Sequence, residues 1–256
     1  MDLNANNYFS NEMSMKYCSV SQIKAFLKCP AAALAELHGE YQRERSTALL
    51  VGSYVDEALT GDLERFKSEN PEIFKRDGTL KAEYAQAEQI IARVSKDEMF
   101  MEYMNGDKQV IMTGKIEGVP VKIKCDSLLP DKIVDLKIMR DFEPIYDPDV
   151  CSRVPFWVAW KYDLQAAVYQ EIVYQNTGKR LPFFLAAATK EKVTDYNIYH
   201  LVQSDLDVAL QTVKGNIVRF DAMKKGIIPA DRCECCDYCR STKKLIDVIS
   251  SDSILI

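Results

Sequence analysis

The chain has 256 residues, a formal net charge of −5 and eight cysteines, and these values exclude several classes of protein. The length allows one large domain with a full core. Because the net charge is negative, a nucleic acid would have to be bound by local basic patches rather than by the charge of the whole protein. No stretch approaches the about 18 apolar residues of a membrane span, and the N-terminus lacks the features of a signal peptide. We expect a soluble protein of the cytoplasm, where thiols stay reduced and clustered cysteines are candidates for metal binding.

The first part of the chain is predicted to be helical. Ser19 and Gln22 have the spacing of a capping box, and Pro30 ends or kinks the helix that starts there. We expect helices over residues 19–29, 30–39 and 47–59, then a polar, mostly helical and peripheral region over 61–107.

The second part mixes strands and helices. The turn at Glu117-Gly118 separates the first two strands of a predicted meander. The elements expected are strands at 109–116, 119–128, 132–139, 183–189 and 196–200, and helices at 155–176 and 203–223. This order predicts an α/β fold with a mixed central sheet flanked by helices.

The second and third predicted strands carry charged residues on one face. Side chains alternate along a strand, so Lys122, Lys124 and Asp126 share a face of the first of these strands. Asp135 and Lys137 share a face of the next, and two carboxylates therefore converge beside lysines. The opposite faces carry residues suited to a core, namely Val121, Ile123, Cys125, Val134, Leu136 and Ile138.

A divalent metal site is one explanation of these carboxylates. Clustered carboxylates are costly in a semi-buried sheet unless a cation joins them. A solvated strand face with an exposed ion pair would show the same pattern, because Asp-x-Lys is a short motif. Asp135-Leu136-Lys137 is the only Asp/Glu-x-Lys sequence of the chain, and Asp126 lies on the neighbouring strand, so the context favours the metal site.

Asp56 is a third candidate carboxylate. It lies at the boundary of the apolar face of its predicted helix, and Gly52, one turn earlier, would let another backbone approach closely. The alternative is that Asp56 and Glu57 form an ordinary solvated pair.

Gln165 and Tyr169 are further candidates for the same site. They are four residues apart and share a face of their predicted helix, where Ala166 and Ala167 leave room around them. Tyr169 would equally fit a residue that only covers the core.

Cysteines near the C-terminus form a separate motif. Cys233, Cys236 and Cys239 have the spacing C-x2-C-x2-C, which lets three thiolates reach one metal centre from a tight loop. A tetrahedral or cubane site needs a fourth ligand, for which Cys29 is the first candidate and Cys18 the second. Unliganded thiols are the alternative.

The order and approximate spacing of four motifs resemble the PD-(D/E)XK nuclease superfamily in its RecB-like branch: Gly52-x-x-x-Asp56, Asp126, Asp135-Leu136-Lys137 and Gln165-x-x-x-Tyr169. The chain looks most like the phage and prophage exonucleases grouped with RecE, which are exodeoxyribonuclease VIII-like. This likeness includes the opening Ser-x-Ser-x-Ile-Lys-x-Phe-x-x-Cys-Pro and the tail Cys-Asp-Tyr-Cys-Arg. It covers nearly the whole chain.

The resemblance implies a restriction-endonuclease-like core with a helical annex, in one nuclease domain over residues 1–256. The region 61–107 would be peripheral, and 231–256 would form a cysteine tail. Two positions depart from the family pattern: Asp56 stands where many RecB-like enzymes have His, and Cys125 precedes Asp126 in place of Pro. Asp56 would still ligate a hard cation through oxygen.

The resemblance also implies roles for the site residues. Mg²⁺ or Mn²⁺ would be held by Asp56, Asp126, Asp135 and the backbone carbonyl of Leu136. Lys137 would position the attacking water, and Gln165 and Tyr169 would orient Lys137 or hold a phosphate. Lys122 and Lys124 would guide the DNA backbone, although a solvated strand edge explains them equally well.

The function implied is a metal-dependent exonuclease that resects the ends of double-stranded DNA. The single-stranded product would pass to an annealing recombinase. The acidic charge also fits a ring-like homo-oligomer around DNA. Alternatives are a single-strand nuclease, an endonuclease, and a catalytically silent DNA-binding or assembly module. Some RecB-like nucleases carry an iron-sulfur cluster, so Cys29, Cys233, Cys236 and Cys239 would hold a 4Fe-4S cluster, with Zn²⁺ as the alternative.

Overall fold

The computed structural model describes residues 2–42, 47–60, 62–148, 150–245, 247–248 and 250. Gly61, in the predicted peripheral region 61–107, lies outside this description. So do residues 246, 249 and 251–256 of the predicted cysteine tail. Within the described residues, no helix has both the length and the apolar character that a membrane span requires.

The N-terminal part is helical, as predicted. Ser19 and Gln22 form the predicted capping box, and Pro30 occupies the first turn of the next helix, which ends at Gly39 with a φ of 75°. The helices are α1 (Asn11–Lys16), α2 (Val20–Lys28), α3 (Pro30–His38), α4 (Thr47–Thr60), α5 (Leu63–Glu69), the 3-10 turn η1 (Pro71–Ile73), α6 (Ala82–Val94) and α7 (Glu98–Tyr103).

The predicted mixed sheet is confirmed. Within the described residues it has five strands in the order β1-β2-β3-β6-β7, and β3 and β6 are parallel while the other neighbours are antiparallel. The strands are β1 (Asp107–Ile116), β2 (Val119–Leu128), β3 (Ile133–Met139), β6 (Phe183–Thr189) and β7 (Tyr196–Leu201). The remaining elements are β4 (Ile145–Asp147), β5 (Ser152–Val154), α8 (Phe156–Ala159), α9 (Tyr162–Thr177), α10 (Gln203–Lys224) and α11 (Asp237–Ser241).

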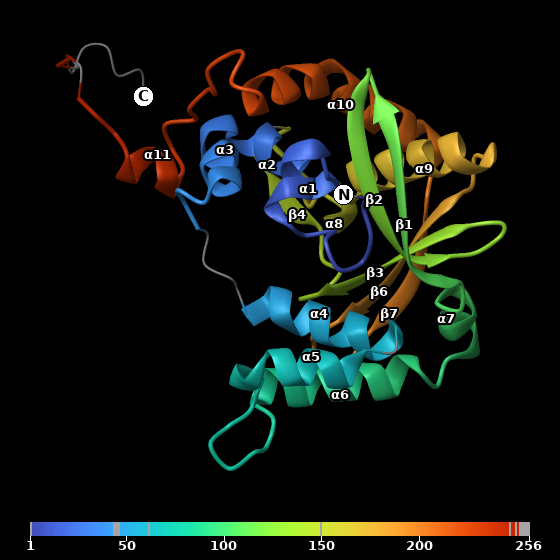
Figure 1. The fold of residues 1–256 in the computed structure, drawn as a ribbon. Coiled ribbons are helices and arrows are strands. Elements are labelled where there is room, and N and C mark those ends of the chain that lie inside the picture. The colour runs from blue at the N-terminus through green and yellow to red at the C-terminus, as the bar shows by residue number, and fades with distance from the viewer. Residues whose placement is uncertain are drawn as a thin grey trace.

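Helices cover both faces of the sheet (Figure 1). Apolar residues of α2, α9 and α10, among them Phe26, Val168 and Ile217, form one core. Residues of α4, α6 and α7, such as Tyr54 and Ile90, form a second core on the other side. The sheet is therefore the middle layer of a three-layer α/β arrangement.

One predicted helix is wrong in detail. We expected a continuous helix over 155–176, but the chain breaks between α8 and α9, where Lys161 has a φ of 54°. The segment contains no internal glycine or proline to indicate a break. The break leaves the carbonyl of Trp160 free to accept a hydrogen bond from Nζ of Lys24 at 3.1 Å. Our expectations also lacked α1, the β4–β5 hairpin and α11.

Candidate active site and cysteine cluster

The predicted carboxylates meet where β2 and β3 separate. The two strands are paired at residues 127–128 and 133–134. Beyond this pairing, Oδ2 of Asp126 accepts a hydrogen bond from the backbone N–H of Leu136 at 2.9 Å. The carboxylate thus takes the place of a backbone carbonyl of the neighbouring strand, and the sheet opens beside it.

The two strands also face different cores at this point. Val121, Ile123 and Cys125 of β2 pack into the core under α9, whereas Val134 and Leu136 of β3 pack into the core under α4. Each strand therefore turns its charged side chains away from a different core. Lys124 and Asp126 of β2 and Asp135 and Lys137 of β3 nevertheless line one cavity.

Asp135 is the most enclosed member of the site. Its side chain is 2% exposed and forms an ion pair with Nζ of Lys137. Its Oδ1 accepts a hydrogen bond from Nε2 of Gln165 at 2.7 Å. Gln165 thus contacts Asp135, whereas the sequence suggested Lys137 or a phosphate as its partner. Nζ of Lys137 also donates to the carbonyl of Leu136 at 3.2 Å.

Asp56 reaches the same site from α4. Its Oδ2 accepts a hydrogen bond from Nε2 of Gln109 at 3.3 Å, which links α4 to β1. Gln109 has a φ of 52°, and the pairing of β1 with β2 is interrupted there, opposite Asp126. Glu57 does not line the cavity that contains Asp56. This orientation agrees with the helix face inferred from the apolar pattern.

These groups line a cavity of about 580 Å³. Tyr162, the first residue of α9, lies between two ammonium groups, with Nζ of Lys24 4.7 Å and Nζ of Lys137 4.9 Å from its ring centroid. Sequence reasoning missed Tyr162 and did not assign Lys24 a role. The only signal was the Ser-x-Ser-x-Ile-Lys motif, because Ser19, Ser21 and Lys24 all line the cavity.

Burial and mutual repulsion shift the protonation of the carboxylates. The pKa of Asp126 is raised well above its usual value by burial and by the charges of Asp135 and Asp56. Burial likewise raises the pKa of Asp56 to about 6. Burial opposes the charge of Lys137, but Asp135 and Asp126 outweigh that effect and raise its pKa, so Lys137 stays protonated.

The donor set fits a hard divalent cation. Three carboxylates converge although burial, with repulsion between them, raises the pKa of two of them. An added positive charge would offset both effects. Oxygen ligands of this kind suit Mg²⁺ or Mn²⁺. The residues present therefore match the cation that the fold implies.

The two lysines of β2 differ in their surroundings. Lys122 is 2% exposed, and its Nζ donates to Ser14 Oγ at 3.4 Å as well as to the carbonyl of Tyr8. Lys124 is partly exposed in the cavity, and its carbonyl accepts a hydrogen bond from the Tyr169 hydroxyl at 3.0 Å. The contacts of Lys122 hold the N-terminal segment on β2, and the accessible ammonium is that of Lys124.

Four cysteines gather away from this cavity. The sulfur atoms of Cys29, Cys233, Cys236 and Cys239 lie within 4.8 Å of one another, an arrangement compatible with metal binding. The Sγ atoms of Cys29 and Cys239 are 3.6 Å apart although the residues are 210 positions apart in sequence. Cys18, the second candidate, instead lies 3.9 Å from Nζ of Lys224, outside this group.

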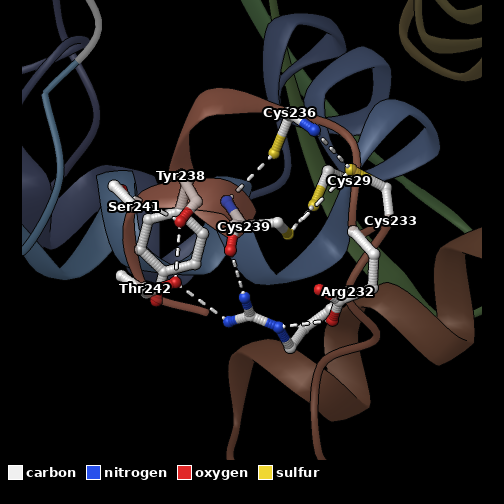
Figure 2. A network of polar contacts seen from close by, with 9 residues as sticks. Cys29, Arg232, Cys233, Cys236, Tyr238, Cys239, Ser241 and Thr242 are labelled. Atoms are coloured by element: carbon white, nitrogen blue, oxygen red, sulfur yellow. Dashed lines mark hydrogen bonds and ion pairs between the residues drawn. The ribbon is translucent and has the colours of Figure 1, made fainter. Parts of the chain in front are cut away.

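Hydrogen bonds organise the segment that carries three of these cysteines, Cys233 and Cys236 in the loop before α11 and Cys239 within α11 (Figure 2). The backbone N–H of Cys236 donates to Sγ of Cys233 at 3.3 Å, and backbone donors at Cys235 and Cys236 lower the pKa of Cys233 to about 6. A thiolate is the form that binds a metal. Arg232 donates to the carbonyl of Cys239 at 2.6 Å and to Oγ1 of Thr242 at 3.0 Å, which fixes the loop against α11.

Comparisons with known proteins agree with this fold. Residues 19–242 match the family described as a PDDEXK-like domain of unknown function. The chain is also similar to a crystal structure of a protein from Eubacterium rectale described as a "putative exonuclease". The two are 47% identical, with 98% of this chain and 97% of that chain covered and a TM-score of 0.93. None of the curated proteins matches.

The match extends over most of the chain, so the protein belongs to the PDDEXK-like family. The mixed sheet with helices on both faces is the restriction-endonuclease-like α/β fold expected from the sequence. The predicted membership of the PD-(D/E)XK nuclease superfamily is confirmed.

Proposed function

We propose that the protein is a metal-dependent exonuclease that acts on the ends of double-stranded DNA. The observation that carries this proposal is the convergence of Asp56, Asp126, Asp135 and Lys137 in one cavity at the opening of the sheet. The description of the Eubacterium rectale relative supports exonuclease activity.

Each residue of the cavity has a role in this proposal. Asp56, Asp126, Asp135 and the carbonyl of Leu136 hold Mg²⁺ or Mn²⁺, which supplies a more acidic bound water and neutralises phosphate charge. Lys137 stays protonated, so it orients the attacking water and offsets charge on the scissile phosphate rather than accepting a proton. Gln165 fixes the carboxylate of Asp135.

The surrounding residues position these groups. Tyr169 supports β2 through the carbonyl of Lys124, and the Lys124 ammonium contacts a DNA phosphate. Lys122 acts indirectly, because its ammonium is buried against residues 8–14.

The cysteine cluster binds a metal centre in this proposal. Family resemblance favours a 4Fe-4S cluster, which the four thiolates would ligate. The sulfur spacing favours one zinc ion, since ligands about 2.3 Å from a tetrahedral centre lie roughly 3.8 Å apart. Brown protein absorbing near 400 nm would identify iron-sulfur, and colourless protein with one equivalent of zinc would identify zinc.

The remaining parts of the proposal follow from the resemblance to RecE-type exonucleases of phages and prophages. Residues 1–256 form one nuclease domain of a cytoplasmic protein, and a homo-oligomer encircles the DNA. The single-stranded product passes to an annealing recombinase.

End-labelled linear duplex DNA and covalently closed circles, with and without Mg²⁺, test the activity. We expect Mg²⁺-dependent degradation of the linear DNA from its ends and survival of the circles. Asp135→Asn and Lys137→Ala should each abolish cleavage in folded protein, and full activity in either variant would refute the assignment. Nicking of circles would identify an endonuclease. If neither duplex substrate is cleaved, an assay on single-stranded DNA separates a single-strand nuclease from a silent DNA-binding module.

A further inference from the structure

An exposed aromatic ring stands at the rim of the catalytic cavity. Phe9 is 77% exposed, more than any other exposed aromatic side chain in the described part of the chain. It lines the cavity that contains Asp126 and also a second cavity of about 320 Å³. Phe9 therefore borders both cavities, and the proposed function gives it no role.

The backbone around Phe9 holds the ring in this position. Tyr8 is 7% exposed, its carbonyl accepts a hydrogen bond from buried Lys122, and its ring packs edge-on against Phe9 with centroids 5.0 Å apart. On the other side, Ser10 caps α1 by accepting a hydrogen bond from the N–H of Met13 at 3.3 Å. The exposure of Phe9 is thus fixed by contacts of its neighbours.

A positive charge lies against the same ring. Nζ of Lys124 is 5.0 Å from the centroid of Phe9. Lys124 precedes Asp126 by two residues on β2, so it lies next to the position where the scissile phosphate would sit. An aromatic face beside an ammonium suits a nucleotide, because the base stacks on the ring and the phosphate pairs with the lysine.

The second cavity provides room for a base next to the ring. Its apolar lining includes Ala25, Phe26 and Leu37, and its polar lining includes the hydroxyl of Ser21 and the carboxylate of Glu36. The amide of Gln22 also lines it but is already hydrogen-bonded to Ser19 and Ser14. An apolar surface with polar groups at its margin is the environment that a planar, hydrogen-bonding base requires.

We propose that Phe9 stacks on the base of the nucleotide adjoining the scissile phosphate and holds that base, unpaired, in the second cavity. Lys124 pairs with the phosphate of the same nucleotide. This inference rests on the proposed function and adds a substrate feature to it. A duplex end must then open locally before cleavage, because a base stacked on Phe9 is no longer paired with its complement.

Fluorescent DNA carrying 2-aminopurine at each terminal position in turn tests the stacking. Binding is measured without turnover in the Asp135→Asn background. Leaving the duplex and stacking on Phe9 should change the fluorescence at one position, and adding Phe9→Ala should remove that change while Phe9→Tyr retains it. If no position shows a difference between Phe9 and Phe9→Ala, the proposal is wrong.

Cleavage by the otherwise unmodified enzyme gives an independent readout. Phe9→Ala should lower kcat/KM by roughly tenfold, with Phe9→Tyr near the original value. An abasic nucleotide at the position whose fluorescence depends on Phe9 should abolish the difference between the original enzyme and Phe9→Ala, because the stacking partner is then missing from both. An equal loss on intact and abasic DNA would indicate a structural effect and overturn the proposal.

Tyr174→Ala is a matched control. Tyr174 is a 43% exposed aromatic residue of α9 that lines neither cavity, so its removal should change neither the fluorescence of bound DNA nor cleavage. A loss as large as that of Phe9→Ala would contradict a specific role for Phe9. Failure of the unmodified enzyme to cleave DNA would refute the proposed function by itself, whereas the fluorescence comparison would still decide the stacking.

Discussion

The carboxylate cavity and the cysteine cluster both join distant parts of the sequence, but they depend on the fold in opposite ways. Asp56, Asp126 and Asp135 come from α4, β2 and β3, elements with large apolar contacts of their own. The cysteine cluster joins the start of α3 to α11 and the loop before it, and its core contains few residues besides the cysteines.

Because of this difference, we expect the carboxylate cavity to determine activity and the cysteine cluster to determine stability. In the cavity, the fold holds carboxylates together against their repulsion, so removing one should cost activity and leave stability unchanged. In the cluster, the metal that we propose there would hold two chain segments together through the thiolates, so removing one thiolate should cost stability first. Variants of each site should therefore fail in different assays.

Asp126→Asn gives the largest effect expected. Cleavage should fall by at least about 1,000-fold, or about 4 kcal/mol of barrier, because a metal ligand is lost. The melting temperature in EDTA should not fall, since the amide oxygen still accepts the N–H of Leu136 and repulsion with Asp135 and Asp56 is removed. Cleavage rates and thermal melts of one preparation check both statements. A cooperative loss of fold would show that the two properties are not separable.

Cys236→Ser should have the largest effect on stability. Loss of one of four ligands should release the metal and lower Tm by roughly 10 °C. Cys235→Ser is the matched control, because Cys235 is adjacent and exposed but lies outside the four-sulfur group. Elemental analysis and thermal melts give the comparison, and equal melting temperatures for the two variants would contradict a structural metal centre.

Much of the fold could be predicted from the sequence, because the local sequence patterns specify the same helices and strands that the tertiary packing requires. The capping box at Ser19 and the alternation in β2 and β3 gave the correct elements. The break at Lys161 could not be predicted, since a left-handed lysine has no local preference that marks it. The contacts around the cavity, such as that between Trp160 and Lys24, accompany this break.

The candidate site was predictable to the same extent. Alternation and helix spacing identified Asp126, Asp135 and Gln165, which the structure brings together. Tyr162 and Phe9 were missed because their positions depend on a helix break and on a segment anchored by buried Lys122. Neither feature has a periodic pattern in the sequence.

Asp56 and Glu57 provide a smaller, sharper comparison within one helix. Asp56→Ala should lower kcat/KM by about 100-fold, equivalent to about 3 kcal/mol, because its carboxylate lines the cavity. Glu57→Ala, about 100° around the helix, should retain activity within about twofold. Initial rates over a range of Mg²⁺ concentrations measure both. The reverse ranking would place Glu57 in the metal site.

The smallest effect expected is the pH dependence of metal stabilisation. The folded-state pKa of Asp56 is raised to about 6 from an ordinary value of 3.8, and the pKa of Asp126 is also raised well above that ordinary value. The folded, metal-free protein therefore binds protons more tightly than the unfolded chain. The associated stabilisation is complete below about pH 4 and is lost as the pH rises through 6.

Mg²⁺ binds the deprotonated carboxylates, so it should raise Tm by a few degrees at pH 8 and by less at pH 5. Melting curves with Mg²⁺ or EDTA at both pH values measure this difference, which Asp126→Asn should reduce. A larger Mg²⁺ effect at pH 5 would contradict the assignment of these carboxylates as the ligands.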